Sequence, residues 1–173
     1  MVIPRKTSEH FSSHSFTIFY YTKEENIGVK GKLTASIEVK CEGHLIHDLF
    51  HSNPHRVPKI CPSKVNHFEI YQGGITKVGS IISWKYKPDR KEKIAKIVIE
   101  AVDHKKKSIT WKVIEGDLLE LYNSFTVITS CEHQWITWAF AYEKKTAVTP
   151  DPLAFLGFFI ELTKDIDGHF LKK

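Results

Sequence analysis

Four histidines of this 173-residue chain are spaced closely enough to suggest shared chemistry. His44, His47, His51 and His55 follow one another at steps of three and four residues, so a helix through them would place their imidazoles near one face. Pro54 interrupts such a helix, and a stable zinc site needs three or four fixed ligands. We therefore expect solvated or helix-capping histidines and no resident metal or other cofactor, with an adventitious metal site as the alternative.

The acidic turn Glu115-Gly116-Asp117 is a second candidate for chemistry. In an apolar cavity a carboxylate acquires a raised pKa and could act as a general base, with Tyr122 or Tyr142 supplying a proton. The simpler interpretation is a structural turn at a strand end, because glycine at 116 permits the backbone angles that such a turn needs. We expect the structural turn and assign no catalytic residue.

The three cysteines, Cys41, Cys61 and Cys131, include no closely spaced pair, which argues against a disulfide scaffold and against a zinc knuckle. They also lack a pattern of partner histidine and aspartate residues. A nucleophilic cysteine would need a lowered pKa, so free thiols that are buried or partly buried are the expectation.

Glycines around Lys77 invite comparison with a phosphate-binding loop. A P-loop requires the pattern GxxxxGK[ST] between a strand and a helix. Here Gly73, Gly74 and Gly79 have the wrong spacing, and strand-like sequences flank them on both sides. The segment is therefore predicted to be a hairpin turn.

Length and composition limit the elements that must position these residues. The length fits one domain, and 42% hydrophobic residues can supply its core. The chain contains no apolar run of about 20 residues for a membrane span, and its net charge of +5 is spread without a basic cluster for nucleic acid. Residues 1–29 lack a secretory hydrophobic region, and we expect a loosely ordered extension. Its alternatives are a targeting arm or an added edge strand through Phe16–Tyr21.

Alternating apolar and polar residues predict a series of strands from Gly31 onward. Residues 42–60 predict two short helices, kinked at Pro54 and Pro58. A long helix follows Pro152, with Asp151 as its N-cap and an apolar face at helical spacing. The strands cover 33–39, 65–72, 79–86, 93–102, 108–117, 124–130 and 134–144, and the helix face is Phe155, Phe159, Leu162, Ile166 and Phe170.

This order predicts an α+β fold in which one curved antiparallel sheet packs against helices. A strongly curved sheet around one long helix can enclose more volume than the helix fills. Alternate strand residues and the helix face would then line a cavity; ordinary close packing of the same residues is the alternative. The candidate ligand-binding residues are Phe68, Ile82, Trp84, Tyr86, Ile99, Ile109, Trp111, Phe125, Trp138, Phe140, Phe155 and Phe159.

Several segments resemble the major latex proteins, a plant branch of the Bet v I and pathogenesis-related class 10 superfamily. They are GKLTASIEVKC, VGSIISWKY, AKIVIEAVD, WKVIEGDLLELYNSF, WAFAYEK and LTKDIDGHFL, within residues 28–172. The resemblance implies a helix-grip fold: a seven-stranded curved antiparallel sheet around a long C-terminal helix, with two short helices between the first two strands. It also implies a large apolar cavity that binds plant metabolites such as sterols, flavonoids, alkaloids or hormones.

The leading hypothesis is a carrier or sensor of a hydrophobic small molecule, in defence or stress response. We expect a cytoplasmic monomer that acts through residues 30–173, without nucleic-acid or membrane partners. The alternative is an enzyme of specialised, alkaloid-type metabolism that uses the same cavity, as a few relatives in the superfamily do. Ribonuclease activity is a third hypothesis, but the sequence offers no histidine pair suited to phosphodiester cleavage.

Overall fold

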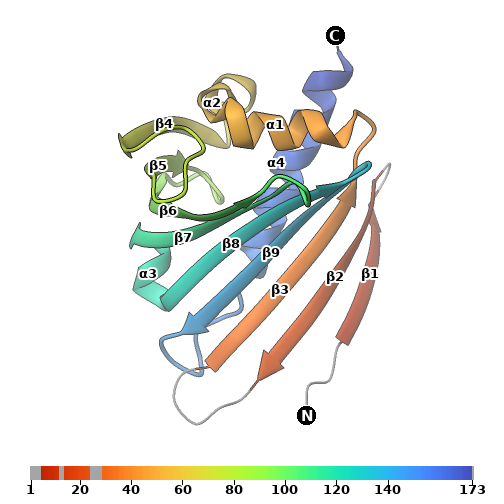
Figure 1. Ribbon diagram of the computed structural model, residues 1–173. Coiled ribbons are helices and arrows are strands. Elements are labelled where there is room, and N and C mark those ends of the chain that lie inside the picture. Colours follow the sequence, from red (N-terminus) through yellow and green to blue (C-terminus); the bar gives the residue numbers. More distant parts are fainter. Residues whose placement is uncertain (1–4, 12–13, 24–28, 173) are drawn as a thin grey trace.

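The computed structural model describes residues 5–11, 14–23 and 29–172, and in this part of the chain nine strands form one antiparallel sheet (Figure 1). The strand order across the sheet is β1-β2-β3-β9-β8-β7-β6-β5-β4. The strands are β1 (Arg5–Phe11), β2 (His14–Lys23), β3 (Val29–Glu38), β4 (Val65–Gln72), β5 (Ile81–Tyr86), β6 (Lys93–Asp103), β7 (Ser108–Gly116), β8 (Tyr122–Glu132) and β9 (Trp135–Lys144).

The helices lie on one side of this sheet. They are α1 (Gly43–Ser52), a 3-10 turn (Pro54–Arg56), α2 (Val57–Ile60), α3 (Leu118–Leu121) and α4 (Leu153–Leu171). The sheet curves around α4, and α1 crosses near the C-terminal end of α4 (Figure 1). None of the described helices combines the length and the apolar character needed to cross a bilayer.

Alternation of apolar and polar residues explains the strands. On β3, Leu33, Ala35 and Ile37 are buried, and on β7 Trp111 is buried while its neighbour Lys112 is exposed. Burying every second residue removes one face of each strand from water and leaves the other solvated. The seven strands predicted from Gly31 onward correspond to β3 through β9, and the predicted α+β fold is confirmed.

The connection between β3 and β4 contains the predicted pair of short helices. α1 ends at Ser52, Pro54 begins the 3-10 turn, and Pro58 lies in the first turn of α2. Proline lacks the N–H that would continue the preceding helix, so the chain breaks where the sequence predicts. The four-residue helix α3, which follows the acidic turn, was not predicted.

The N-terminal segment extends the sheet at the β3 edge. β2 pairs antiparallel with β3, placing Ile18 opposite Ala35, and β1 pairs with β2. Of the expectations for residues 1–29, the added edge strand through Phe16–Tyr21 coincides with β2. Residues 1–4, 12–13 and 24–28 lie outside the described residues, and the expectation of an extension separate from the domain at residues 30–173 stays a prediction.

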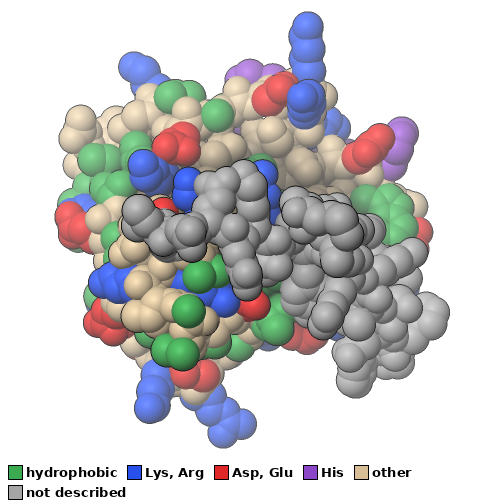
Figure 2. All heavy atoms as spheres, turned by 90° about the horizontal axis from the view of Figure 1, so that it is seen from below, with side chains coloured by type: hydrophobic (Ala, Val, Ile, Leu, Met, Phe, Trp, Pro, Cys, Tyr) green, Lys and Arg blue, Asp and Glu red, His purple; other side chains and the backbone are tan. Residues whose placement is uncertain are grey.

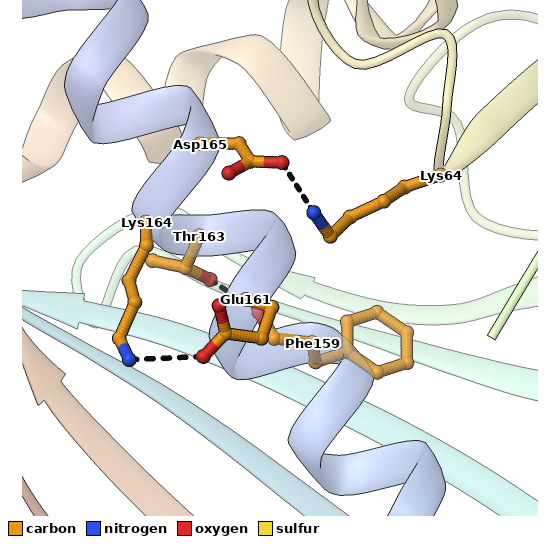
Figure 3. Close-up of polar contacts among 6 residues, drawn as sticks. All are labelled: Lys64, Phe159, Glu161, Thr163, Lys164 and Asp165. Carbon is orange, nitrogen blue, oxygen red and sulfur yellow. Dashed lines mark hydrogen bonds and ion pairs between the residues drawn. The ribbon is translucent and has the colours of Figure 1, made fainter. Parts of the chain in front are cut away.

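Polar contacts hold the C-terminal half of α4 in place. The buried Asp167 carboxylate accepts hydrogen bonds from the backbone N–H groups of Lys40, at 3.1 Å, and Cys41, at 2.8 Å, in the connection between β3 and α1. Two residues earlier, the Asp165 carboxylate forms an ion pair with Lys64 (Figure 3). These contacts join α4 to both ends of the helical segment that follows β3.

The predicted N-cap of α4 is wrong. Pro152 occupies the cap position, and no side chain caps the helix. The Asp151 carboxylate instead accepts a 2.7 Å hydrogen bond from Tyr142 Oη and lies 2.9 Å from Lys144 Nζ, both on β9. Burial raises the pKa of Asp151, but the hydrogen bonds from Tyr142 and Lys144 outweigh burial and leave it below its usual value. Side chains of β9 therefore bind the carboxylate that the sequence pattern assigned to the helix cap.

Candidate ligand-binding cavity

A cavity lies between the curved sheet and the helices. Its wall contains residues from the six strands β4 to β9, with β4 contributing Val65 alone, and from all four α-helices. The lining residues are Phe50, Val57, Val65, Trp84, Tyr86, Ala95, Ile97, Trp111, Val113, Leu118, Val127, Trp138, Phe155, Phe158, Phe159 and Leu162. Eight of these residues are aromatic, so aromatic rings dominate a wall that is almost entirely apolar.

The open space within this wall is about 70 Å³. Sites for drug-sized ligands usually measure roughly 300–1,000 Å³. The protein's own rings account for the difference: the centroids of Trp138 and Phe159 are 4.4 Å apart, and those of Phe155 and Phe159 are 5.0 Å apart. Accommodating a sterol-sized molecule therefore requires some of these rings to move.

Trp138 is a fixed part of the wall. It is fully buried, and its indole Nε1 donates a 2.9 Å hydrogen bond to Thr163 Oγ1 on α4. The Thr163 hydroxyl in turn donates to the Phe159 carbonyl oxygen at 2.8 Å, a contact drawn in Figure 3. This chain of hydrogen bonds satisfies the buried indole N–H and fixes β9 against α4.

The twelve residues that were predicted to bind a ligand differ in whether they reach the cavity wall. Six of them line the cavity: Trp84, Tyr86, Trp111, Trp138, Phe155 and Phe159. Five others are buried in the adjoining core without reaching the wall: Ile82, Ile99, Ile109, Phe125 and Phe140. Phe68 is the exception, since it is only partly buried and packs against Trp84 at the edge of the sheet, with ring centroids 4.6 Å apart.

Several lining residues were missing from the prediction. Ile97, Val113 and Val127 lie on the inward faces that strand alternation identifies, so the sequence signal for them was present. Phe158 and Leu162 belong to the inward side of α4. Phe50 and Val57 come from the proline-interrupted helices, where periodicity does not show which side chains point inward.

The acidic turn is structural, as predicted. Asp117 Oδ2 accepts a 2.7 Å hydrogen bond from the Ile94 N–H, and the Asp117 N–H donates to the Ile94 carbonyl at 3.1 Å. Gly116 has φ +121°, and a Cβ there would overlap the Ile94 carbonyl. The Glu115 side chain is 67% exposed and forms an ion pair with Lys96, so it lies outside the cavity.

The remaining candidates for acid–base catalysis are also occupied elsewhere. Tyr142 Oη donates to Asp151, and Tyr122 Oη donates to the Pro150 carbonyl at 2.7 Å. Burial, followed by the nearby Asp151 charge, raises the pKa of Tyr122 to about 12. Among the described residues, the cavity wall holds no carboxylate, lysine or histidine. Tyr86 is the titratable residue among those that line the described wall.

The four histidines differ in burial and in the residues that they contact. His55 is exposed, but His47 is only 8% exposed, so the expectation of a solvated residue is wrong there. His47 stacks on His51 with ring centroids 5.4 Å apart, and His51 meets His104 of the β6–β7 turn at 5.3 Å. Within the described part of the chain, no three His, Cys, Asp or Glu side chains are placed to hold a metal ion.

The three cysteines are buried free thiols, as predicted. Burial is the main cause that raises the pKa of Cys41 to about 12 and of Cys61 to about 11, and burial likewise raises the pKa of Cys131. Thiolates are thus disfavoured at all three positions, which makes them poor nucleophiles.

The surface shows mixed charge. Figure 2 views one face of the molecule, where the coloured lysine and arginine side chains are interspersed with aspartate and glutamate. On the described part of that face the positive charges do not merge into a single basic patch.

Comparisons with known proteins agree with this fold and cavity. The profile of the Pathogenesis-related protein Bet v 1 family matches residues 28–173. MLP-like protein 31 of Arabidopsis thaliana is 38% identical over 87% of this chain and 92% of its own. The crystal structure of ginseng major latex-like protein 151 from Panax ginseng has a TM-score of 0.79 at 36% identity, covering 81% of this chain and 97% of its own.

A more distant match is norcoclaurine synthase from Thalictrum flavum in complex with dopamine and hydroxybenzaldehyde. Its TM-score is 0.64 at 17% identity, covering 84% of this chain and 88% of its own, so the similarity is one of fold. The family profile and the more similar relatives agree on a closer assignment: the chain belongs to the Bet v 1 family, in its major latex protein branch.

Proposed function

We propose that this protein binds a hydrophobic small molecule in the cavity between the sheet and α4. The observation that carries the proposal is the cavity wall, which is almost entirely apolar and half aromatic. Such walls hold planar apolar molecules by burying their surface and by stacking rings against them. Sterols, flavonoids, alkaloids and hormone-like compounds are the ligand classes that the family suggests.

Binding would be driven by apolar burial and limited by the need to move rings. Removing about 300 Å² of ligand surface from water provides roughly 7 kcal/mol at about 25 cal/mol per Å², before the costs of association. Phe155 and Phe159 are only partly buried, which makes them the rings best placed to shift. We therefore expect the cavity to widen on the α4 side when a ligand enters.

The wider role follows the family and remains part of the proposal. We propose a monomer that acts in the cytoplasm during defence or stress responses, without a cofactor. Its task would be to carry or sense the ligand rather than transform it, because the described cavity wall lacks an acid–base pair. The alternative of alkaloid-type catalysis has support only from the fold shared with norcoclaurine synthase.

Native mass spectrometry of protein purified from plant tissue, compared with the same sample after denaturation, tests the proposal first. A small hydrophobic molecule that is retained natively and lost on denaturation would support it and identify the ligand class. A thermal-shift series with sterols, flavonoids and alkaloids would then rank those classes.

A cavity-filling variant ties binding to this site. Ala95→Leu adds three carbons to the wall and should weaken binding of the ligand at least tenfold. The matched control is Ala101→Leu, because Ala101 lies on the same strand but is exposed. Equal affinity in Ala95→Leu and the wild type would refute the cavity as the binding site.

A further inference from the structure

Tyr86 differs from the other two tyrosines that are buried in the described part of the chain, Tyr122 and Tyr142. Tyr122 donates to the Pro150 carbonyl and Tyr142 donates to Asp151. Tyr86 is only 4% exposed, yet its hydroxyl has no hydrogen-bond partner within the described residues. Buried polar groups are nearly always paired, so an unpaired hydroxyl calls for an explanation.

The position of Tyr86 supplies one. Its side chain lines the cavity, and its ring packs against Phe155 and Phe158 of α4, with centroid distances of 5.4 and 5.8 Å. Two other buried ring nitrogens without partners, His47 Nδ1 and His51 Nε2, belong to residues outside the cavity wall. Among the described residues of this wall, Tyr86 thus contributes the one fully buried side-chain polar atom that has no hydrogen-bond partner.

We propose that Tyr86 Oη is the group that hydrogen-bonds to the ligand in the cavity, an inference that rests on the proposed function. The ligand is then a neutral hydrophobic molecule with one hydroxyl or carbonyl group that pairs with this hydroxyl. The ligand's polar group would then lie beside the N-terminal half of α4. Its apolar body would extend toward Trp111 and Trp138. A purely apolar molecule would leave the hydroxyl unpaired and would bind less well.

The surroundings of Tyr86 favour a neutral ligand that accepts a hydrogen bond. Burial, followed by the nearby charges of Asp117 and Asp89, raises the pKa of Tyr86, which keeps the hydroxyl protonated and able to donate. Neither carboxylate pairs with it: Asp117 accepts from the Ile94 N–H and Asp89 from the Lys91 N–H. The same burial and negative charges would oppose a ligand carboxylate at this point.

Binding of three matched probes tests the proposal. We expect the wild type to bind 2-naphthol about tenfold more tightly than naphthalene, the difference that one buried hydrogen bond provides, and to bind 2-naphthoate more weakly than 2-naphthol. Tyr86→Phe should remove the preference for 2-naphthol over naphthalene while leaving naphthalene affinity unchanged. Equal affinity of the wild type for these two probes, or a preference that survives in Tyr86→Phe, would overturn the role of Tyr86.

These outcomes are distinct from failure of the proposed function. If neither naphthalene nor 2-naphthol binds, the cavity proposal fails and the inference about Tyr86 fails with it. If both bind equally, the cavity proposal stands and only the role of Tyr86 is lost. The matched control is Tyr122→Phe, which removes a buried hydroxyl outside the cavity wall and should keep the preference for 2-naphthol.

Thermal unfolding of the free protein supplies a readout that does not depend on any ligand. Tyr86→Phe removes an unpaired hydroxyl, so its Tm should equal or exceed that of the wild type. Tyr122→Phe removes a paired one and should lower Tm by about 2–4 °C. A Tyr86→Phe loss as large as that of Tyr122→Phe would show that the protein itself pairs the hydroxyl, which contradicts the proposal.

Discussion

The C-terminal half of α4 is held by polar contacts, whereas its N-terminal half is held by aromatic rings. Asp167, Asp165 and Thr163 tie the C-terminal half to the β3–α1 connection, to Lys64 and to Trp138. The N-terminal half presents Phe155, Phe158 and Phe159 to the cavity. Directional hydrogen bonds fix a position, while packed rings can slide and reorient. The C-terminal half of the helix is thus fixed by directional contacts, and the N-terminal half is the part that the proposed ligand would displace.

Of the changes that test this difference between the two halves of α4, removing the Asp167 carboxylate should lower the free energy of unfolding most. Asp167→Ala leaves the Lys40 and Cys41 N–H groups without their acceptor in a buried setting, so we expect a loss of about 3 kcal/mol in the free energy of unfolding. Urea unfolding measures it. Asp165→Ala is the control, since that ion pair is partly exposed and should contribute under about 1 kcal/mol. Equal losses would contradict a buried polar anchor.

Acidification should also lower the free energy of unfolding through contacts near the C-terminal half of α4, by less than the Asp167→Ala substitution does. α1 packs against α4 and carries His47 and His51. Burial is the main cause that lowers both pKa values; neighbouring histidines, and Lys107 in the case of His47, add to it, while Asp48 opposes it. The unfolded chain therefore binds protons more readily than the folded one. Stability is complete above about pH 6.5 and falls as the pH drops below that value.

The urea midpoint measured between pH 7.5 and pH 5 checks this expectation. His47→Gln should flatten the dependence because glutamine cannot be protonated in this range. His55→Gln is the control, as His55 is exposed and should leave the profile unchanged. A profile that is equally steep in His47→Gln and the wild type would exclude His47 as the cause.

Substituting either of two glycines in α4 should give the smallest change in stability, and it compares the two halves of the helix directly. A Cβ added at Gly157 or Gly168 would meet no atom within 4 Å outside the helix itself, so alanine at either position should stabilise by roughly 0.5–1 kcal/mol. Gly157 lies in the ring-bearing half and Gly168 in the anchored half. Only Gly157→Ala should slow ligand association in stopped-flow fluorescence, because it stiffens the half that must move. Equal association rates in the two variants would count against an adaptable N-terminal half.

Sequence periodicity predicted which side chains of a strand point into the protein, but it did not predict which of them reach the cavity. Alternation placed Trp111, Phe125 and Phe140 on the inward side of their strands, and all three are buried. Only Trp111 reaches the cavity, because curvature of the sheet decides which inward residues meet the helix. Phe125 and Phe140 pack behind Phe155 instead, with ring centroids 5.7 and 5.2 Å from it. A pattern of period two carries no information on that second layer.

Tertiary partners explain the other differences between prediction and structure. Asp151 followed by proline has the sequence of a helix cap. Its carboxylate instead accepts a hydrogen bond from Tyr142 and forms an ion pair with Lys144. Phe50 enters the cavity wall from a short helix whose orientation depends on packing against β8, β9 and α4. In both cases the deciding residues belong to another secondary-structure element, and the pattern within one helix or strand does not show such contacts.

The strands β1 and β2 change which backbone edge the sheet presents. The family profile begins at residue 28, so the part of the chain that it matches would end its sheet at β3, a strand with buried Leu33, Ala35 and Ile37. Such apolar edges invite pairing with another chain. In the described sheet the last strand is instead β1, whose sequence RKTSEHF is rich in charge. Charged residues on an edge strand oppose pairing with another chain, so this hairpin would make edge-to-edge aggregation less favourable.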